Sequence, residues 1–421
     1  MTGAKTQIVE LLTEAGVKIN GSNTWDIQVF DERLYSRVLA GGSLALGEAY
    51  MDGWWDSPAL DQFLHKIFSA RLEKKFRLTW ASVMLFIKSF FFNLQGPRRV
   101  FQIGDHHYDI GNDLYQAMLD KRLTYTCGYW NGNPPARGLD EAQEAKLDLV
   151  CRKIGLKKRE AVLDIGCGWG SFAKYAAEKY GASVTGITVS KEQVALGTEL
   201  CRNLPVEIKL QDYRDVRGEF DHVVSLGMFE HVGVKNYRTY IKAVADCLKD
   251  SGLFLLHAIG SNRSVYSTDP WVQKYIFPNG MLPSAAQIAR AIEGLFVMED
   301  WHNFGADYDK TLMMWFRNFN RAWPDLKGKY GERFYRMWKF YLLSCAAAFR
   351  ARRIQLWQIV LSKRGIPWRI YVNQINNRDY HEPRRTFVRR KNLHLSDASG
   401  NPAVGTLAAL LTKCTIVVEK K

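Results

Sequence analysis

From about residue 160 onwards, short apolar segments alternate with longer segments whose apolar residues recur at helical spacing. The apolar segments have the length of strands, and the segments between them are typical of amphipathic helices. Strands that alternate with helices in this way form a parallel, doubly wound α/β sheet. We therefore predict a seven-stranded, mostly parallel sheet. Its strands are expected at residues 161–166, 183–188, 206–212, 220–227, 252–260, 296–305 and 353–361, with helices at 171–181, 190–202, 236–250 and 283–294.

The rest of the chain has a different character. The first hundred residues contain the extended segment TWDIQVF and the Gly/Trp-rich segment GGSLALGEAYMDGWW. From residue 366 to the end there are ten basic and four acidic residues and no strand–helix alternation. We expect a smaller N-terminal α+β domain (1–100), a catalytic domain (101–365) and a basic, poorly packed C-terminal tail (366–421).

Charge is the first clue to a partner. The net charge is +15, which calls for an anionic partner. Residues 71–99 carry seven basic residues and one acid, interleaved with phenylalanine and tryptophan. This pattern favours a helix that lies on a membrane surface, although an ordinary amphipathic core helix has the same composition. No segment of about 18 apolar residues is present to span a bilayer, and no nucleic-acid-binding motif is found.

The cysteines and the N-terminus bear on the compartment. Seven cysteines are scattered without CxxC spacing, which is typical of reduced thiols in a cytosolic protein and not of a disulfide framework or a metal site. The opening MTGAKTQIVELLTEAG lacks the charged-then-apolar pattern of a signal peptide. We therefore expect a cytoplasmic protein that associates with the inner face of the membrane.

A glycine-rich turn follows the first predicted strand in VLDIGCGWG. Gly166, Gly168 and Gly170 permit a tight turn and a close approach of a ligand to the backbone. Together with Asp164 and the later QDYRD, this turn resembles that of the class I S-adenosylmethionine-dependent methyltransferases. The resemblance implies that Asp212 binds the adenine amino group. A turn that serves packing alone is the structural alternative.

The second strand departs from the pattern of that class. Many of these enzymes end this strand with an acid that binds the ribose, whereas here it ends GITVSKEQ. Thr188 and Gln193 are then the neutral candidates for the ribose. The full set of candidate cofactor residues is Tyr125, Thr126, Asp164, Gly166, Cys167, Gly168, Gly170, Thr188, Gln193 and Asp212.

Seven further segments narrow the resemblance. They are GSLALGEAYMDGWW, HYDIGNDLY, YTCGYW, MFEHVG, LLHAIG, DPWVQKYIFPNG and EDWHNFGADYD. Together they are similar to the cyclopropane-fatty-acyl-phospholipid synthases over about residues 5–363. The resemblance implies transfer of a methylene unit from S-adenosylmethionine to the cis double bond of an unsaturated phospholipid acyl chain, by a homodimer that works at an anionic bilayer surface.

The same resemblance implies a bicarbonate ion as the general base. Its cage would contain Glu230 of MFEHVG and His257 of LLHAIG, which are expected at the ends of neighbouring strands, together with the Tyr308 phenol and backbone amides around Cys127 and Ile259. Glu230 would then hold the base without being the base, and we expect His231 to be structural. The carbocation left by alkene attack needs aromatic faces, for which the candidates are Phe304, Tyr308, Trp315 and Phe316.

Two cysteines are weighed separately. Cys127 lies in an aromatic stretch and is a possible nucleophile, but methyl transfer to an alkene requires no covalent intermediate, so a backbone and packing role is favoured. Cys345 in SCAAAFRAR matches a family cysteine, and its small neighbours suggest helix packing. It is retained as a minor catalytic candidate.

Three other functions stay open at this stage. A sister enzyme would use the same cation to leave a methyl- or methylene-branched chain. A lipid-binding protein with a degenerate methyltransferase fold would need broken site residues, and none is broken. A nucleic-acid methyltransferase would explain the charge, but the Asn/Asp-Pro-Pro-Tyr loop that binds amines is replaced by LGMFEHVG.

Overall fold

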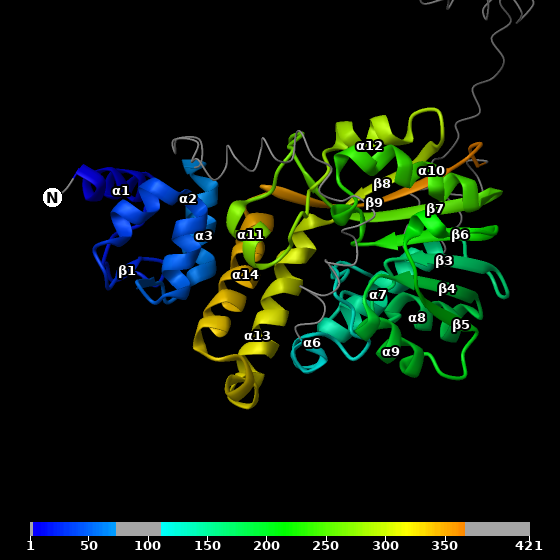
Figure 1. The fold of residues 1–421 in the computed structure, drawn as a ribbon, viewed down its shortest axis with the longest axis horizontal. Helices are drawn as coiled ribbons and strands as arrows, with labels where there is room; N and C mark the ends of the chain where they lie inside the picture. The colour runs from blue at the N-terminus through cyan, green and yellow to red at the C-terminus, as the bar shows by residue number, and fades with distance from the viewer. Residues whose placement is uncertain (1–2, 73–110, 367–421) are drawn as a thin grey trace, which may run out of the picture. The chain divides into compact units, whose positions relative to one another are not determined.

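The structure is a computed structural model that describes residues 3–72 and 111–366. A seven-stranded sheet with strand order β5-β4-β3-β6-β7-β9-β8 forms its centre (Figure 1). Only β9 runs antiparallel to its neighbours, so the predicted mostly parallel sheet is confirmed. The strands are β3 (Ala161–Ile165), β4 (Ser183–Thr188), β5 (Val206–Leu210), β6 (Phe220–Leu226), β7 (Leu248–Ser261), β8 (Val297–Asn303) and β9 (Ile354–Ser362).

Helices cover both faces of this sheet, which explains why its strands read as apolar runs. Along β3, Val162 packs with α7 and α8, whereas Leu163 packs with α10 and α12. Figure 1 shows these two pairs of helices on opposite faces of the sheet. Helix α9 contacts β4 and β5. The covering helices are α7 (Leu139–Lys153), α8 (Ser171–Tyr180), α9 (Lys191–Leu200), α10 (Tyr237–Cys247) and α12 (Ala285–Ile292).

The predicted boundary between the helix at 236–250 and the strand at 252–260 is wrong. The helix expected at residues 236–250 ends at Cys247, and β7 begins at the next residue, Leu248. The change occurs without a glycine or proline, so no local breaker marked it. Pairing of Leu248 with Phe220 of β6 extends the strand towards its N-terminal end.

A long helical hairpin separates β8 from β9. Helices α13 (Gly305–Tyr330) and α14 (Glu332–Arg350) are joined at Gly331, whose φ of 75° is a left-handed conformation that suits glycine. The Arg350 guanidinium at the end of α14 binds the Asp309 carboxylate at 2.8 and 2.9 Å and the Asp61 carboxylate at 2.8 Å. The hairpin is thereby tied to the N-terminal part of the chain.

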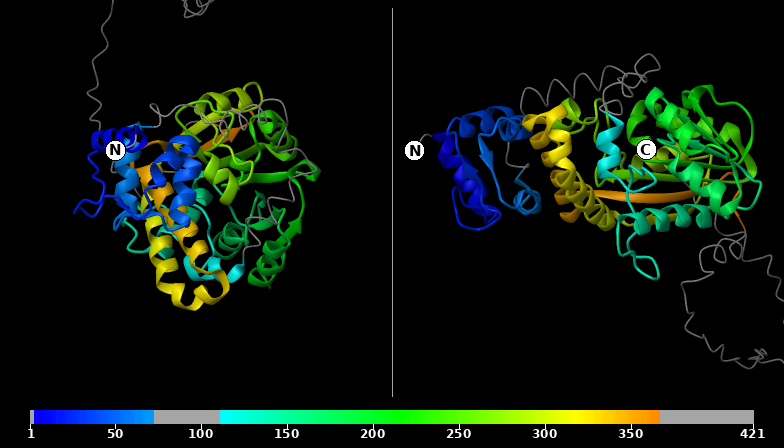
Figure 2. Two further views of the ribbon diagram at one scale, coloured as in Figure 1. Left: turned by 60° about the vertical axis from the view of Figure 1, so that its left-hand side comes forward. Right: turned by 90° about the horizontal axis from the view of Figure 1, so that it is seen from below.

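The N-terminal segment combines three helices with a small antiparallel sheet. Its core is continuous with that of the hairpin, because Tyr50 and Trp55 contact the ring of Phe340 on α14. Helix α3 packs along α14 (Figure 2). The elements are α1 (Gly3–Glu14), β1 (Gln28–Val29), α2 (Leu34–Met51), β2 (Trp55–Asp56) and α3 (Leu60–Ser69).

Short elements complete the described part of the chain. They are α6 (Asn112–Met118), α11 (Pro270–Tyr275) and the 3₁₀ helices η4 (Tyr213–Asp215), η5 (Phe229–His231) and η6 (Val234–Asn236). None of the helices within residues 3–72 and 111–366 is both long and apolar enough to cross a membrane.

Candidate active site

The glycine-rich turn joins β3 to α8 at the carboxyl end of the sheet. Gly166, Gly168 and Gly170 have φ values of 80°, 57° and 81°, which side chains other than glycine rarely adopt. A Cβ at Gly166 would lie 2.6 Å from the Cβ of Met228. A Cβ at Gly168 would meet no atom within 4 Å, because this residue borders a cavity. The turn therefore exposes its backbone to a ligand.

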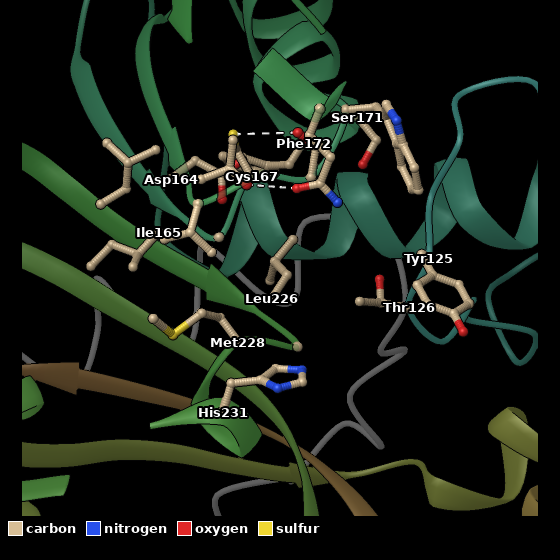
Figure 3. Close-up of a pocket in the computed structure, with 18 of the residues that line it drawn as sticks. Tyr125, Thr126, Asp164, Ile165, Cys167, Ser171, Phe172, Leu226, Met228 and His231 are labelled. Atoms are coloured by element: carbon tan, nitrogen blue, oxygen red, sulfur yellow. Dashed lines mark hydrogen bonds between the residues drawn. The ribbon is translucent and has the colours of Figure 1, made fainter. Parts of the chain in front are cut away.

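This first cavity has a volume of about 130 Å³ and lies between the turn and the 123–126 loop (Figure 3). Figure 3 shows Tyr125 and Thr126 across the cavity from Asp164 and Cys167. All of the predicted cofactor residues line it except Gly170, which instead packs beneath the turn, where a Cβ would lie 2.8 Å from Ile208.

Asp164 is the most unusual of these residues. Its side chain is 1% exposed, and neither carboxylate oxygen has a hydrogen-bond partner among the described residues. Burial raises the pKa of Asp164 to about 7, and the charge of Lys146 opposes this rise. A buried acid without a partner at the edge of a cavity suits a cationic group such as an amine.

Two further sets of polar groups in this cavity are paired with neighbouring residues. The Thr188 hydroxyl donates to the Gln193 amide oxygen at 2.6 Å, at the end of β4. Asp212 accepts from the backbone N–H of Arg214 at 2.9 Å and pairs with its guanidinium at 2.8 Å. At the end of β4 the cavity thus presents the neutral Thr188–Gln193 pair, where many class I methyltransferases carry an acid. The charge of the Asp212 carboxylate is compensated by the Arg214 guanidinium.

A second, larger cavity of about 340 Å³ adjoins the first. Tyr125, Thr126, Gly227 and His231 line both cavities, so the two meet at these residues. The walls of the second cavity are mostly apolar and come from α2, α3, α11 and the α13–α14 hairpin. Among the predicted catalytic residues, those that line it are Glu230, His257, Ile259, Tyr308 and Cys345.

Glu230 does not lie at the end of a strand. Strand β6 ends at Leu226, and the chain turns at Gly227 so that Glu230 falls in η5. One carboxylate oxygen accepts the Ile259 backbone N–H at 2.6 Å, while the other, Oε2, has no hydrogen-bond partner in the described structure. Burial raises the pKa of Glu230 to about 7, and the Ile259 N–H opposes this rise.

His257 lies on β7 opposite the last residue of β6, Leu226. Its Nδ1 is 3.4 Å from the side-chain nitrogen of Gln358 on β9, and its Nε2 has no partner among the described atoms. Burial, together with the charges of Lys146 and Lys153, holds the pKa of His257 well below its usual value. The imidazole is therefore neutral at physiological pH.

The aromatic candidates are not equivalent. Tyr308 is the one that lines the second cavity, and burial raises the pKa of its phenol above the usual range. Phe304, Trp315 and Phe316 line neither cavity. Phe304 and Trp315 instead support site residues, with ring centroids 5.7 Å from His257 and 5.9 Å from Tyr308.

Cys127 lines neither cavity and is fully buried. Its thiol donates to the Gly128 carbonyl at 3.1 Å, and burial raises its pKa, so it stays protonated. A protonated, enclosed thiol is a poor nucleophile. Cys345 borders the second cavity, and burial raises its pKa to about 12.

His231, which is expected from the sequence to be structural, lines both cavities. Figure 3 shows it beside the first of them. Its ring contacts that of Phe277, with centroids 5.7 Å apart, and burial lowers its pKa to about 4. Sequence reasoning also missed Lys146 and Gln358. In the sequence, both resemble ordinary polar residues of amphipathic elements.

Two predictions fall outside the described residues. The basic-aromatic segment 71–99 is described only at its first two residues, and the basic tail from 366 only at its first.

Comparison with known proteins decides the family. Residues 96–359 match the family of mycolic acid cyclopropane synthetases. The chain belongs to this family. Membership confirms the resemblance seen in the sequence and identifies the protein as an enzyme, a methyltransferase.

Comparisons with individual proteins support the assignment to the cyclopropane synthetase family. The chain is 52% identical over 354 residues to the cyclopropane-fatty-acyl-phospholipid synthase of Escherichia coli, covering 84% of this chain and 92% of that protein. The structure resembles the cyclopropane synthase MmaA2 from Mycobacterium tuberculosis with a TM-score of 0.59 and 27% identity, over 62% of this chain and 98% of that one. It also resembles the mycolic acid cyclopropane synthase CmaA1 complexed with SAH and CTAB, with a TM-score of 0.58 and 29% identity, over the same shares of the two chains.

Proposed function

We propose that the protein is a cyclopropane-fatty-acyl-phospholipid synthase that uses S-adenosylmethionine as methylene donor. The observation that carries this proposal is the junction of two unlike cavities at Tyr125, Thr126, Gly227 and His231. One cavity contains a buried, unpartnered acid and an exposed glycine turn. The other is mostly apolar and is lined by residues of five α-helices of the described structure. A small cation and an acyl chain would meet where the cavities join.

The residues of the first cavity fit S-adenosylmethionine. Asp164 has two free acceptor oxygens for the amino group, and Gly168 leaves room against the backbone. The Thr188–Gln193 pair would face the ribose and Asp212 the adenine. When bound, the cofactor supplies an electrophilic methyl group. These contacts would fix the position of the cofactor's methyl group and exclude water. A weak alkene nucleophile would then meet a methyl group that is already close and correctly oriented.

The second cavity contains the groups that would hold bicarbonate. Glu230 Oε2 and His257 Nε2 are buried polar atoms without partners in the described structure, and both residues face an otherwise apolar space. With a pKa of about 7, Glu230 keeps its proton on about half of the molecules at neutral pH and can donate it to an anion. Bound there, bicarbonate would supply the base for the proton lost from the transferred carbon.

The decisive assay uses purified protein, S-adenosylmethionine, bicarbonate and vesicles of a cis-monounsaturated phospholipid, with the acyl products examined by proton NMR. Strongly upfield ring protons and the loss of the olefinic signal are expected. Retained unsaturation with a new branch would replace the proposal by the methyl- or methylene-branching activity. No product would contradict both. Repeating the assay in carbonate-depleted buffer tests the base, because turnover should fall and recover when bicarbonate is restored.

Association with an anionic membrane belongs to the same proposal and is supported by the sequence of residues 71–99 and the net charge of +15. Replacing Lys74, Lys75 and Arg77 together by glutamate should reduce co-sedimentation with anionic vesicles, since it reverses three charges. Sedimentation with neutral vesicles is the control. Unchanged binding to anionic vesicles would refute this part. A homodimer is expected from the resemblance alone and can be checked by light scattering.

A further inference from the structure

Lys146 on α7 is fully buried, which is rare for lysine. Its ammonium donates to the Thr126 hydroxyl at 2.8 Å. One turn earlier on the same helix, the fully buried Gln143 donates its amide to the Thr126 carbonyl at 2.7 Å. Helix α7 therefore holds both the side chain and the backbone of Thr126.

The position of Thr126 matters because this residue lines both cavities. Across the junction lies Gly227, where an added Cβ would be 2.8 Å from the Thr126 Cγ2. The space at the junction is therefore determined by the orientation of the Thr126 side chain. Lys146 itself lines only the first cavity.

Four titratable groups from separate elements interact electrostatically with Lys146: Asp120 after α6, Cys127 in the following loop, Asp164 on β3 and His257 on β7. The thiol is protonated and the imidazole neutral, so the two carboxyl groups are the members that can carry a charge opposite to that of Lys146. Asp120 already accepts two backbone N–H groups and a hydroxyl from the residues that follow it. Asp164 has no such partners, and of the two carboxylates it is the one that lines the first cavity together with Lys146.

We propose that Lys146 is a positioning residue for the cofactor: its buried ammonium fixes Thr126 at the junction and supplies the positive charge opposite the Asp164 carboxylate. This inference rests on the proposed function, because it assumes that Asp164 receives the amino group of S-adenosylmethionine. Lys146 is too enclosed to act as a surface ion pair, and its hydrogen bond to a hydroxyl does not require a charge. Asp120 is already hydrogen-bonded by the residues that follow it, whereas Asp164 lines the same cavity as Lys146 without such partners, so the charge of Lys146 bears on the ligand through Asp164.

A pH signature follows from this arrangement. Burial raises the pKa of Asp164 to about 7 even with Lys146 present, and burial lowers the pKa of Lys146 to about 8. Removing the lysine charge should raise the pKa of Asp164 further, so that the acid binds a cation poorly near neutral pH. Above pH 8 the native lysine also loses its charge while Asp164 is ionised in the native protein. The difference in ligand affinity between the native protein and a variant without the lysine charge should therefore decrease as the pH rises.

The test measures binding of S-adenosylhomocysteine to the full chain by calorimetry between pH 6 and pH 9. Lys146→Met removes both the charge and the hydrogen bond, whereas Lys146→Gln removes the charge and keeps a donor for Thr126. Lys153→Met is the matched control: this lysine is also buried on α7, its ammonium lies 2.7 Å from Asp300, and it lines neither cavity.

We expect both Lys146 variants to bind about tenfold more weakly than the native protein near pH 6.5, the effect of about one pKa unit at Asp164. The difference in affinity between the native protein and these variants should narrow towards pH 9. Any additional loss of affinity in Lys146→Met, which also lacks the hydrogen bond to Thr126, should not depend on pH. Lys153→Met should follow the native profile. If the Lys146 variants bind more weakly by the same factor at every pH, the inference is overturned. It is also overturned if their binding is weakened no more than that of Lys153→Met.

Three further outcomes are informative. Failure of both Lys146 variants to fold, judged by circular dichroism and thermal melting, would overturn the inference in favour of a purely structural lysine. A native protein that binds no S-adenosylhomocysteine would instead overturn the proposed function on which the inference rests. Native binding with unaltered Lys146 variants would overturn the inference alone.

Discussion

Replacing Glu230 by glutamine should change how the stability of the folded protein depends on pH. The pKa of Glu230 is raised from an ordinary value of 4.5 to about 7 because the carboxyl is buried with one hydrogen-bond donor, the Ile259 N–H. In the unfolded chain the group loses its proton near pH 4.5, whereas in the folded protein it keeps the proton until about pH 7. The folded state therefore loses stability, relative to the unfolded state, as the pH rises through this window.

The magnitude follows from the size of the shift. Each pKa unit corresponds to about 1.4 kcal/mol, so a shift of roughly 2.5 units destabilises the folded protein by about 3 kcal/mol at high pH. Between pH 5 and pH 8 the change amounts to roughly 2.5 kcal/mol. Glutamine cannot ionise and has nearly the same shape, so Glu230→Gln should gain about this much stability, relative to the native protein, on going from pH 5 to pH 8.

The assay is urea unfolding of both proteins at pH 5 and pH 8. The buried Asp164 also titrates near pH 7, but it is present in both proteins and cancels in the difference. Glu10→Gln, at an exposed position of α1, is the control for the removal of one carboxyl group from the protein. An equal stability difference between Glu230→Gln and the native protein at both pH values would refute the argument that burial keeps Glu230 protonated. The variant should also lose most of its turnover, which separates function from stability at this residue.

Three other substitutions test separate parts of the site. Gly168→Ala introduces strain at φ 57° of about 1 kcal/mol and places a methyl group in the first cavity, so calorimetry should show roughly tenfold weaker binding of S-adenosylhomocysteine; unchanged affinity would mean that no ligand approaches this turn. Cys127→Ser should keep most of the product formation in the NMR assay, because the native thiol is buried and protonated. Complete loss of turnover in a folded Cys127→Ser protein would argue for a nucleophile. Arg350→Met leaves the carboxylates of Asp309 and Asp61 without their shared partner and should cost about 2–3 kcal/mol in urea unfolding; a loss below about 0.5 kcal/mol would show that this contact does not fasten the hairpin.

The sheet was predictable from the sequence because burial on both faces leaves a direct record in it. Consecutive residues of β3 and β6, such as Val162–Leu163 and Val223–Val224, are apolar because they pack against helices on opposite faces, and the glycines of the turn after β3 are required by their backbone angles. These are local constraints. The residues that border the first cavity follow the strand ends, so most of them were also found.

Contacts made across the fold were not predictable in the same way. Glu230 seemed to end a strand, but the turn at Gly227 brings its carboxylate to the Ile259 amide of the neighbouring strand. In the sequence, Lys146 resembles a solvated residue of an amphipathic helix, but in the structure its ammonium is bound to Thr126 of the 123–126 loop. Nothing in the local pattern of either residue records the partner, because that partner comes from another element.

The connection between β8 and β9 has a consequence for how such enzymes change. Asn303 at the end of β8 pairs with Trp357 of β9, so the two strands form a hairpin from which α13 and α14 emerge as one long excursion. Part of the wall of the apolar cavity belongs to that excursion, whereas Asp164 and the glycine turn belong to β3, which β6 and β7 separate from β9. Mutations that lengthen, shorten or reshape the excursion leave the strand pairing intact. Preference for one lipid over another can therefore diverge between lineages, or be redesigned, while the machinery for the methyl donor is inherited unchanged.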